Sequence, residues 1–152
     1  MAGPAAPSSP VDFLSTVSLF KTLPREVLED LASKTVERPY PAGAEIIRRG
    51  EPGDGLYIVL AGLVQVCATE GATGDERVVA VFGPGEAFGE LSLLDGKPRS
   101  ASVVASWSAR CLFLPRDAFQ THLDQHPDTA RALLRVLAAR LREMDRRLAQ
   151  RS

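Results

Sequence analysis

Short runs of aliphatic and aromatic residues, separated by glycine, proline or aspartate, fill the middle of the chain. Such runs are typical of β-strands. Eleven of the 12 glycines lie between Gly43 and Gly96, and glycine punctuates turns while it disfavours helix interiors. Evenly spaced short strands predict a sandwich or a barrel, with residues 71–76 as a hairpin loop. We expect strands within residues 45–50, 56–62, 63–70, 77–82, 101–106 and 109–114.

Helical periodicity appears at both ends of the chain. Asp12 is a candidate N-cap for a short helix. A second helix is predicted over residues 23–34, because their leucines and valine fall on one helical face and Pro24 suits the first turn. A third helix is expected over residues 114–123. Pro127 then stands where a new helix would begin.

The last helix, residues 127–150, carries apolar residues spaced 3, 4, 3 and 4 apart, with arginines off the seam. This heptad pattern favours pairing of two parallel helices across a dimer axis, because exposed leucine-rich surface is costly. The alternative is a helix that packs only on its own domain. The seam consists of Leu134, Leu137, Leu141, Met144 and Leu148.

These elements predict an α+β fold, an antiparallel β-barrel or jelly roll with short N-terminal helices and a long C-terminal helix. We expect residues 1–11 to form a flexible leader, because MAGPAAPSSP is rich in proline, alanine and serine. The β-barrel domain is expected over residues 12–126, and the dimerisation helix over residues 127–152.

Composition and charge exclude several classes of protein. The 152 residues are 45% hydrophobic and 24% charged, which is ordinary for a globular domain, and the net charge of −1 gives no overall basic field for nucleic acid. The charge is uneven, however, because residues 127–152 hold seven arginines against three acidic residues. The chain is therefore an acidic body with a basic tail, whose arginines we expect to solvate the outer face of a paired helix.

Two cysteines, Cys67 and Cys111, are too few for a disulfide-rich scaffold or an iron–sulfur site, and we expect them to act as small hydrophobes. The chain has no run of 18 apolar residues and no signal-peptide pattern at its start. We therefore expect a cytoplasmic protein with reduced thiols and no membrane partner.

The segment FGPGEAFGELSLLDGKPRSA, residues 82–101, holds the candidate chemistry. Gly89 permits close approach or an unusual dihedral, and a short helix behind it would offer free N–H groups to an anion. Arg99 brings a planar fork suited to two phosphate oxygens, and Ser100 a hydroxyl. Glu90 fits a sugar hydroxyl rather than a phosphate. The expected ligand combines one phosphate with one sugar hydroxyl.

The same residues carry a family resemblance. FGELSLLDGKPRSA resembles the phosphate-binding cassette of the cyclic nucleotide-binding domain family, and PAGAEIIRRGEPGDGLYIVLAGLVQV resembles that family's opening strands. The similarity extends over roughly residues 12–150, and the last helix looks most like the dimerisation helix of bacterial cyclic-AMP receptor-type transcription regulators. It implies a cyclic nucleotide-sensing regulatory domain that binds cyclic AMP or cyclic GMP as ligand, without a cofactor.

The resemblance implies a role for each matching residue. Glu90 would hold the ribose 2′-OH, and Arg99 and Ser100 would hold the cyclic phosphate. The remaining matches are backbone and loop contacts at Gly89, Leu91 and Ser92, and barrel-wall contacts to the base at Val66 and Val79.

The sequence departs from the bacterial regulators in two respects. Met144 and Asp145 occupy the places of a polar pair that reads the base from across the dimer, and an ionised Asp145 only accepts hydrogen bonds, from adenine or guanine. The regulators also continue into a helix-turn-helix domain. We expect DNA contact only through such a domain, which would begin where this sequence stops, at Ser152.

Two alternative functions remain open from the sequence, a cyclic nucleotide-binding module that regulates a partner protein and a dimerisation domain without ligand. Catalysis is not expected, since no nucleophile–base pair appears. His122 and His126 are spaced i, i+4, which suits zinc, but no third ligand is evident. We therefore predict two partly exposed histidines and no metal. A metal-dependent cupin barrel would need histidines on its strands, which hold none.

Overall fold

A computed structural model describes residues 9–69 and 74–151 of the chain. Within these residues, eight strands form two four-stranded sheets, in the orders β1-β8-β3-β6 and β2-β7-β4-β5, and every strand pair is antiparallel. The strands are β1 (Val36–Tyr40), β2 (Glu45–Ile47), β3 (Gly55–Ala61), β4 (Val64–Thr69), β5 (Glu76–Phe82), β6 (Ala87–Phe88), β7 (Ser102–Ala105) and β8 (Ala109–Pro115). The antiparallel jelly-roll prediction is confirmed, but the two sheets stay open and do not close into a barrel.

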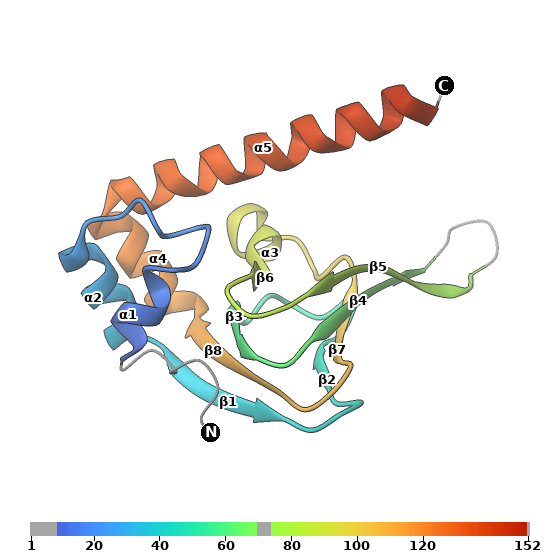
Figure 1. Ribbon diagram of the computed structural model, residues 1–152, viewed down its shortest axis with the longest axis horizontal. Coiled ribbons are helices and arrows are strands. Elements are labelled where there is room, and N and C mark those ends of the chain that lie inside the picture. The colour runs from blue at the N-terminus through green and yellow to red at the C-terminus, as the bar shows by residue number, and fades with distance from the viewer. Residues whose placement is uncertain (1–8, 70–73, 152) are drawn as a thin grey trace, which may run out of the picture.

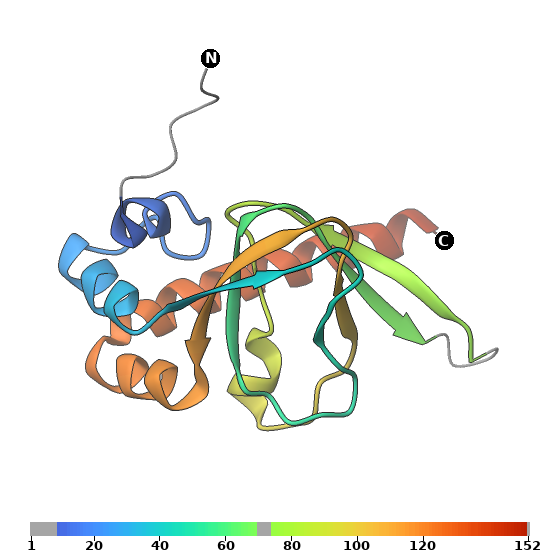
Figure 2. The same cartoon turned by 90° about the horizontal axis from the view of Figure 1, so that it is seen from below.

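The helices gather beside the sheets. In Figure 1, α1, α2 and α4 lie together at one end, α3 lies near the middle, and α5 runs along the molecule to the C-terminus. Figure 2 shows the two sheets from below, with α5 behind them. The bounds are α1 (Pro10–Leu14), α2 (Arg25–Ser33), α3 (Glu90–Asp95), α4 (Arg116–Gln125) and α5 (Pro127–Arg151).

The core has two parts. One lies between the sheets around Tyr57, Val59 and Phe88, and the other joins the helices to β3 and β8 through Phe20, Phe119 and their neighbours. The start of α5 contributes Ala132 and Leu133 to the second part, with 5% and 2% of their surfaces exposed. This packing fixes α5 to the domain through its first two turns.

The remainder of α5 extends from the core with its apolar seam exposed. Leu134, Leu141, Met144 and Leu148 are 59–67% exposed in this single chain, and Leu137 is half-buried. The buried Ala132–Leu133 pair lies in the first two turns of α5, whereas Leu141, Met144 and Leu148 lie in later turns that extend away from the core.

Several expected features differ in the structure. Asp12 lies inside α1, whose N-cap is Ser9, and α1 begins at Pro10, inside the expected leader. Residues 1–8 of that leader and residues 70–73, which include the first three residues of the expected hairpin loop, lie outside the described residues. Two strands were not expected: β1, which has no apolar alternation, and the two-residue β6.

The prediction of two partly exposed histidines is wrong for one of them. His122 is completely buried, because α2 and the start of α5 cover the face of α4 that carries it. Only the second histidine, His126, is partly exposed.

Candidate functional site

The site begins at the turn between β6 and α3. Gly89 is the residue before α3 and has a φ of 91°, in the left-handed region that side-chain-bearing residues rarely adopt. A Cβ at this position would also lie 2.9 Å from Arg99 Nη1. Glycine therefore lets the turn bring its carbonyl against the arginine and start α3 at Glu90.

Arg99 is held by three acceptors from two other segments. Its Nη1 donates to the Gly89 carbonyl at 2.6 Å, and its Nη2 donates to the Gly55 carbonyl at 2.8 Å and to Asp54 Oδ1 at 3.0 Å. The residue is only 5% exposed. Because bonds to charged groups are strong and directional, the guanidinium is fixed before any ligand arrives.

Asp54 links this arginine to the core between the sheets. Its carboxylate accepts hydrogen bonds from the Tyr57 hydroxyl as well as from Arg99. Burial, with the nearby Asp54 charge, raises the pKa of Tyr57 well above its ordinary value. The phenol therefore stays a hydrogen-bond donor at neutral pH, and it holds Asp54 in place beneath the guanidinium.

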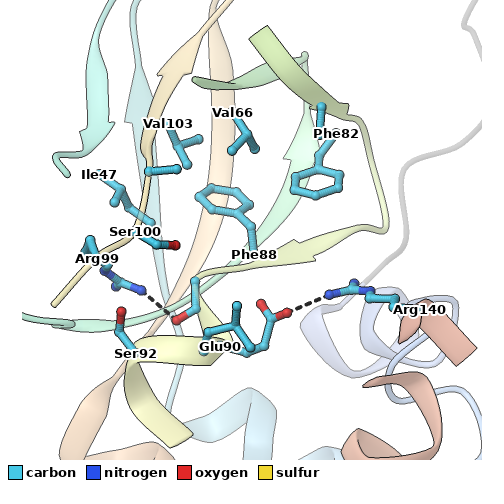
Figure 3. Close-up of a pocket in the computed structure, with 14 residues that line it drawn as sticks. Ile47, Val66, Phe82, Phe88, Glu90, Ser92, Arg99, Ser100, Val103 and Arg140 are labelled. Atoms are coloured by element: carbon cyan, nitrogen blue, oxygen red, sulfur yellow. Dashed lines mark hydrogen bonds and ion pairs between the residues drawn. The ribbon is translucent and has the colours of Figure 1, made fainter. Parts of the chain in front are cut away.

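Glu90 faces the other end of the site. Its side chain is 10% exposed, and its Oε1 accepts a hydrogen bond from Arg140 Nη1 of α5 at 2.5 Å. Figure 3 shows this ion pair and the bond from Arg99 to the Gly89 carbonyl on opposite sides of Glu90. The long helix thus contacts the site through Arg140, a residue that no motif in the sequence indicates.

One cavity of about 190 Å³ joins these groups. Ile47, Val66, Phe82, Phe88 and Val103 supply an apolar wall, and Figure 3 shows them on the sheet side of the polar residues. The rings of Phe82 and Phe88 stack with centroids 6.3 Å apart. The cavity therefore offers an apolar wall on one side and a buried cation, a carboxylate and hydroxyls on the other. It is lined also by Gly89, Glu90, Leu91, Ser92, Arg99, Ser100, Ala101, Ala80 and Arg140.

Most of the residues expected from the sequence line this one cavity. They are Val66, Gly89, Glu90, Leu91, Ser92, Arg99 and Ser100. Their convergence depends on three segments: β4, the turn into α3, and the loop before β7.

Val79 does not line the cavity, contrary to expectation. A bulge in β5 leaves it without a partner, since Val66 pairs with Ala80 while Cys67 pairs with Val78. Val79 is 55% exposed, and Ala80 and Phe82 face the cavity instead. A bulge adds one residue and so changes which side chains face inward, an effect that the strand pattern alone does not reveal.

Met144 and Asp145 are exposed on α5 and do not line the cavity of their own chain. Arg140 lines it instead, one helical turn before Met144. The i, i+4 spacing between these two residues was the signal in the sequence that could have identified Arg140. The aromatic pair Phe82 and Phe88 was also missed, although both residues flank the glycine-rich turn.

The two cysteines are free and sit apart from this chemistry. Cys111 is buried, and burial raises its pKa to about 12, whereas Cys67 is half-buried with a pKa that burial also raises. Thiols that remain protonated are poor nucleophiles.

Among the described residues, no helix has the length and apolar character that crossing a membrane would require.

Sequence and structure comparisons relate the chain to the same family of proteins. The family model described as "Cyclic nucleotide-binding domain" matches residues 37–126. The chain is 32% identical, over 91% of its length and 61% of the relative's, to a protein of Mycobacterium tuberculosis named "CRP-like cAMP-activated global transcriptional regulator". It is 41% identical, over 84% of its length and 58% of the relative's, to the "Cyclic AMP receptor protein" of Thermus thermophilus.

A solved structure agrees with these sequence matches. The crystal structure of the Thermus thermophilus catabolite activator protein superposes with a TM-score of 0.79 and 40% identity, covering 87% of this chain and 62% of that one. The chain thus spans about three fifths of the length of these relatives.

Proposed function

The chain belongs to the cyclic nucleotide-binding domain family, and from this premise we propose that it is a sensor that binds a cyclic nucleotide and transmits binding through α5. The observation that carries the proposal is the convergence of Arg99, Ser100 and Glu90 on one cavity with an apolar wall. A cyclic nucleotide combines the three chemical parts that this cavity would bind: an anionic phosphate, a ribose hydroxyl and a flat base.

The phosphate is assigned to Arg99 and Ser100. A guanidinium has five N–H donors, and the described bonds of Arg99 go to two backbone carbonyls and Asp54. These bonds fix the guanidinium of Arg99, which lines the cavity with its positive charge. Ser100 adds a hydroxyl beside it, so the phosphate would enter a prearranged cationic site in which little ordering entropy is lost.

The ribose 2′-OH is assigned to Glu90. Arg140 occupies Oε1 of this carboxylate, and a carboxylate has about four lone-pair sites, so Glu90 can accept from a hydroxyl and from Arg140 together. A bound ribose would thereby be connected to α5 through Glu90. A ligand that fits best when these groups are in contact shifts the population towards that arrangement.

We expect the base to lie along the apolar wall of Val66 and Phe82, and cyclic AMP to be preferred over cyclic GMP. The names of the two bacterial relatives support cyclic AMP. Asp145 is exposed on α5, where it would meet a base only from a partner chain. An ionised carboxylate there accepts from the amino group of adenine or of guanine, so Asp145 does not by itself decide between the two nucleotides.

The output is assigned to a homodimer formed through the exposed seam of α5. In the dimer, four exposed apolar side chains at heptad spacing would pack against a partner helix and leave water. Full burial of each such side chain contributes about 1.5–3 kcal/mol to the free energy of association. We propose that the chain is the non-catalytic, cytoplasmic effector region of a transcription regulator. Contact with DNA would belong to a helix-turn-helix domain outside residues 1–152. The name "global transcriptional regulator" of one relative supports a role in transcription.

Calorimetric titration with cyclic AMP and cyclic GMP tests the binding proposal. Arg99→Leu should weaken binding by roughly 2–5 kcal/mol, because it removes a charge-assisted contact from a shielded site. Arg110→Leu is the matched control, since Arg110 is exposed on β8. It should bind like wild type.

A milder variant guards against loss of the fold. Arg99 also holds two backbone carbonyls, so circular dichroism of Arg99→Leu must show a folded chain. Ser100→Ala leaves that scaffold intact and should cost about 0.5–1.5 kcal/mol of binding. If neither nucleotide binds the wild type, or if both variants bind as tightly as the wild type does, the proposed function is wrong.

A further inference from the structure

A second cluster of chemically capable side chains lies at the helical end of the molecule, where α2, α4 and α5 meet (Figure 1). Its centre is His122 of α4, which is completely buried. The Nδ1 of this imidazole lies 2.6 Å from Asp30 Oδ2 of α2, and its Nε2 lies 2.7 Å from Thr129 Oγ1 in the first turn of α5. These residues do not line the cavity of the nucleotide site.

His126 completes the cluster one helical turn after His122. The two imidazoles lie with centroids 4.8 Å apart, and His126 Nε2 is 3.5 Å from the same Asp30 oxygen. One donor atom from each of the three residues falls within 4.8 Å of the other two. The sequence offered no third ligand for this histidine pair. The fold supplies one in Asp30, from 92 residues earlier in the chain.

We propose that Asp30, His122 and His126 form a binding site for one divalent transition-metal ion of the zinc class, with water in the remaining position. Two imidazoles and one carboxylate are a ligand set that zinc uses, with bonds of about 2.0–2.2 Å. Two ligand atoms at that distance on a tetrahedral ion lie roughly 3.4 Å apart. The His126–Asp30 separation of 3.5 Å already matches this spacing. The His122–Asp30 pair, at 2.6 Å, must open by about 0.8 Å when the ion displaces their hydrogen bond.

The surroundings prepare each ligand for metal binding. His122 is completely buried, and burial favours the neutral imidazole that metals bind. Once Nδ1 turns to the ion, the ring proton lies on Nε2, whose N–H can donate a hydrogen bond to Thr129 Oγ1. Lys34 donates to Oδ1 of Asp30, so Oδ2, which is hydrogen-bonded to His122 Nδ1 in this structure, is the oxygen that would turn to the ion.

Access and placement also fit a site that loads after folding. The side chains of Asp30 and His126 are 22% and 27% exposed, so an ion can enter from solvent, whereas His122 closes the inner side. The bound ion would cross-link α2 to the end of α4. Because Thr129 is hydrogen-bonded to the same imidazole, the bound ion would also restrict the position of the start of α5.

The test is titration of the tag-free full chain with zinc after treatment with a chelator, followed by titration with cobalt(II), whose visible absorption reports coordination. We expect one ion per chain. His126→Ala and Asp30→Asn should each weaken zinc binding at least tenfold, since loss even of outer-shell partners costs about 10–100-fold. Asp124→Asn, an exposed carboxylate on the same helix, is the control and should leave the affinity unchanged.

Each outcome decides the proposal. His126 is partly exposed, so His126→Ala should fold even if Asp30→Asn does not, and circular dichroism checks both. Absence of zinc binding by the wild type overturns the site. Binding that survives in a folded His126→Ala variant at unchanged affinity also overturns it. Nucleotide titrations of the same variants distinguish this result from failure of the proposed function, because the two sites share no ligand residue.

Discussion

The ion pair between Glu90 and Arg140 should couple the site to the long helix by a measurable free energy. The Glu90 side chain is 10% exposed and that of Arg140 is 46% exposed, so the pair lies between a surface bridge and a buried one. Surface bridges contribute about 0.2–1 kcal/mol, and breaking a buried pair costs about 3–5 kcal/mol. We therefore expect a coupling energy of about 1–2 kcal/mol.

A double-mutant cycle measures this coupling. Urea unfolding of wild type, Glu90→Gln, Arg140→Gln and the double variant gives the interaction free energy, because the cycle subtracts the effects that each change has alone. Glutamine keeps the approximate length of both side chains and removes their charges. Arg146→Gln is the control, since Arg146 is an exposed arginine of α5 that pairs with Glu143.

Arg140→Gln and a further variant, Glu90→Ala, test the ribose assignment. Arg140→Gln should lower nucleotide affinity about five- to tenfold, equal to roughly 1 kcal/mol, because the carboxylate loses the partner that orients it. A nucleotide without the 2′-OH should bind wild type more weakly than the complete nucleotide does. For Glu90→Ala, the difference between the two nucleotides should be much smaller. A coupling energy below about 0.3 kcal/mol, within the scatter expected of independent sites, would refute the reasoning, as would an equal loss of 2′-deoxy affinity in both proteins.

Three further predictions concern other parts of the chain. Asp54→Asn should weaken nucleotide binding in calorimetry by about 1 kcal/mol, because the phosphate-binding arginine loses a half-exposed charged partner; unchanged affinity would contradict this. Leu137→Glu combined with Leu141→Glu should give monomers in sedimentation where wild type gives dimers, since it places charges in the seam, and a monomeric wild type would remove the basis for the seam. At pH 8, a thiol reagent should modify Cys67 well before Cys111, whose burial raises its pKa to about 12 and keeps it protonated; two equally fast thiols before unfolding would contradict the structure.

The local pattern of residues was sufficient to predict an element where a segment determines its own conformation. The apolar runs at residues 56–62 and 109–114 became β3 and β8 in the core, and Pro127 begins the last helix as expected. Strand β1 escaped notice because four of its five residues are exposed and it contains Pro39. An edge strand of this kind is defined by its pairing with β8, not by its own alternation.

The candidate site was partly readable for the same reason. Residues 89–100 are close in sequence, so spacing alone placed Gly89, Glu90, Arg99 and Ser100 together. The bulge that turns Val79 outward depends on the register between β4 and β5. That register is decided by which side chains fill the space between the sheets, and single-strand patterns do not record it.

Local spacing and the conformations that the residues allow account for the short strands in the middle of the chain, the glycine-dependent turn before α3 and the apolar seam of α5. Which distant groups meet depends on the packing of the whole fold. Glu90 reaches Arg140 across 50 residues, and His122 reaches Asp30 across 92. Such pairings are set by how whole helices and sheets bury their apolar faces against one another, and the polar partners are brought together by that packing.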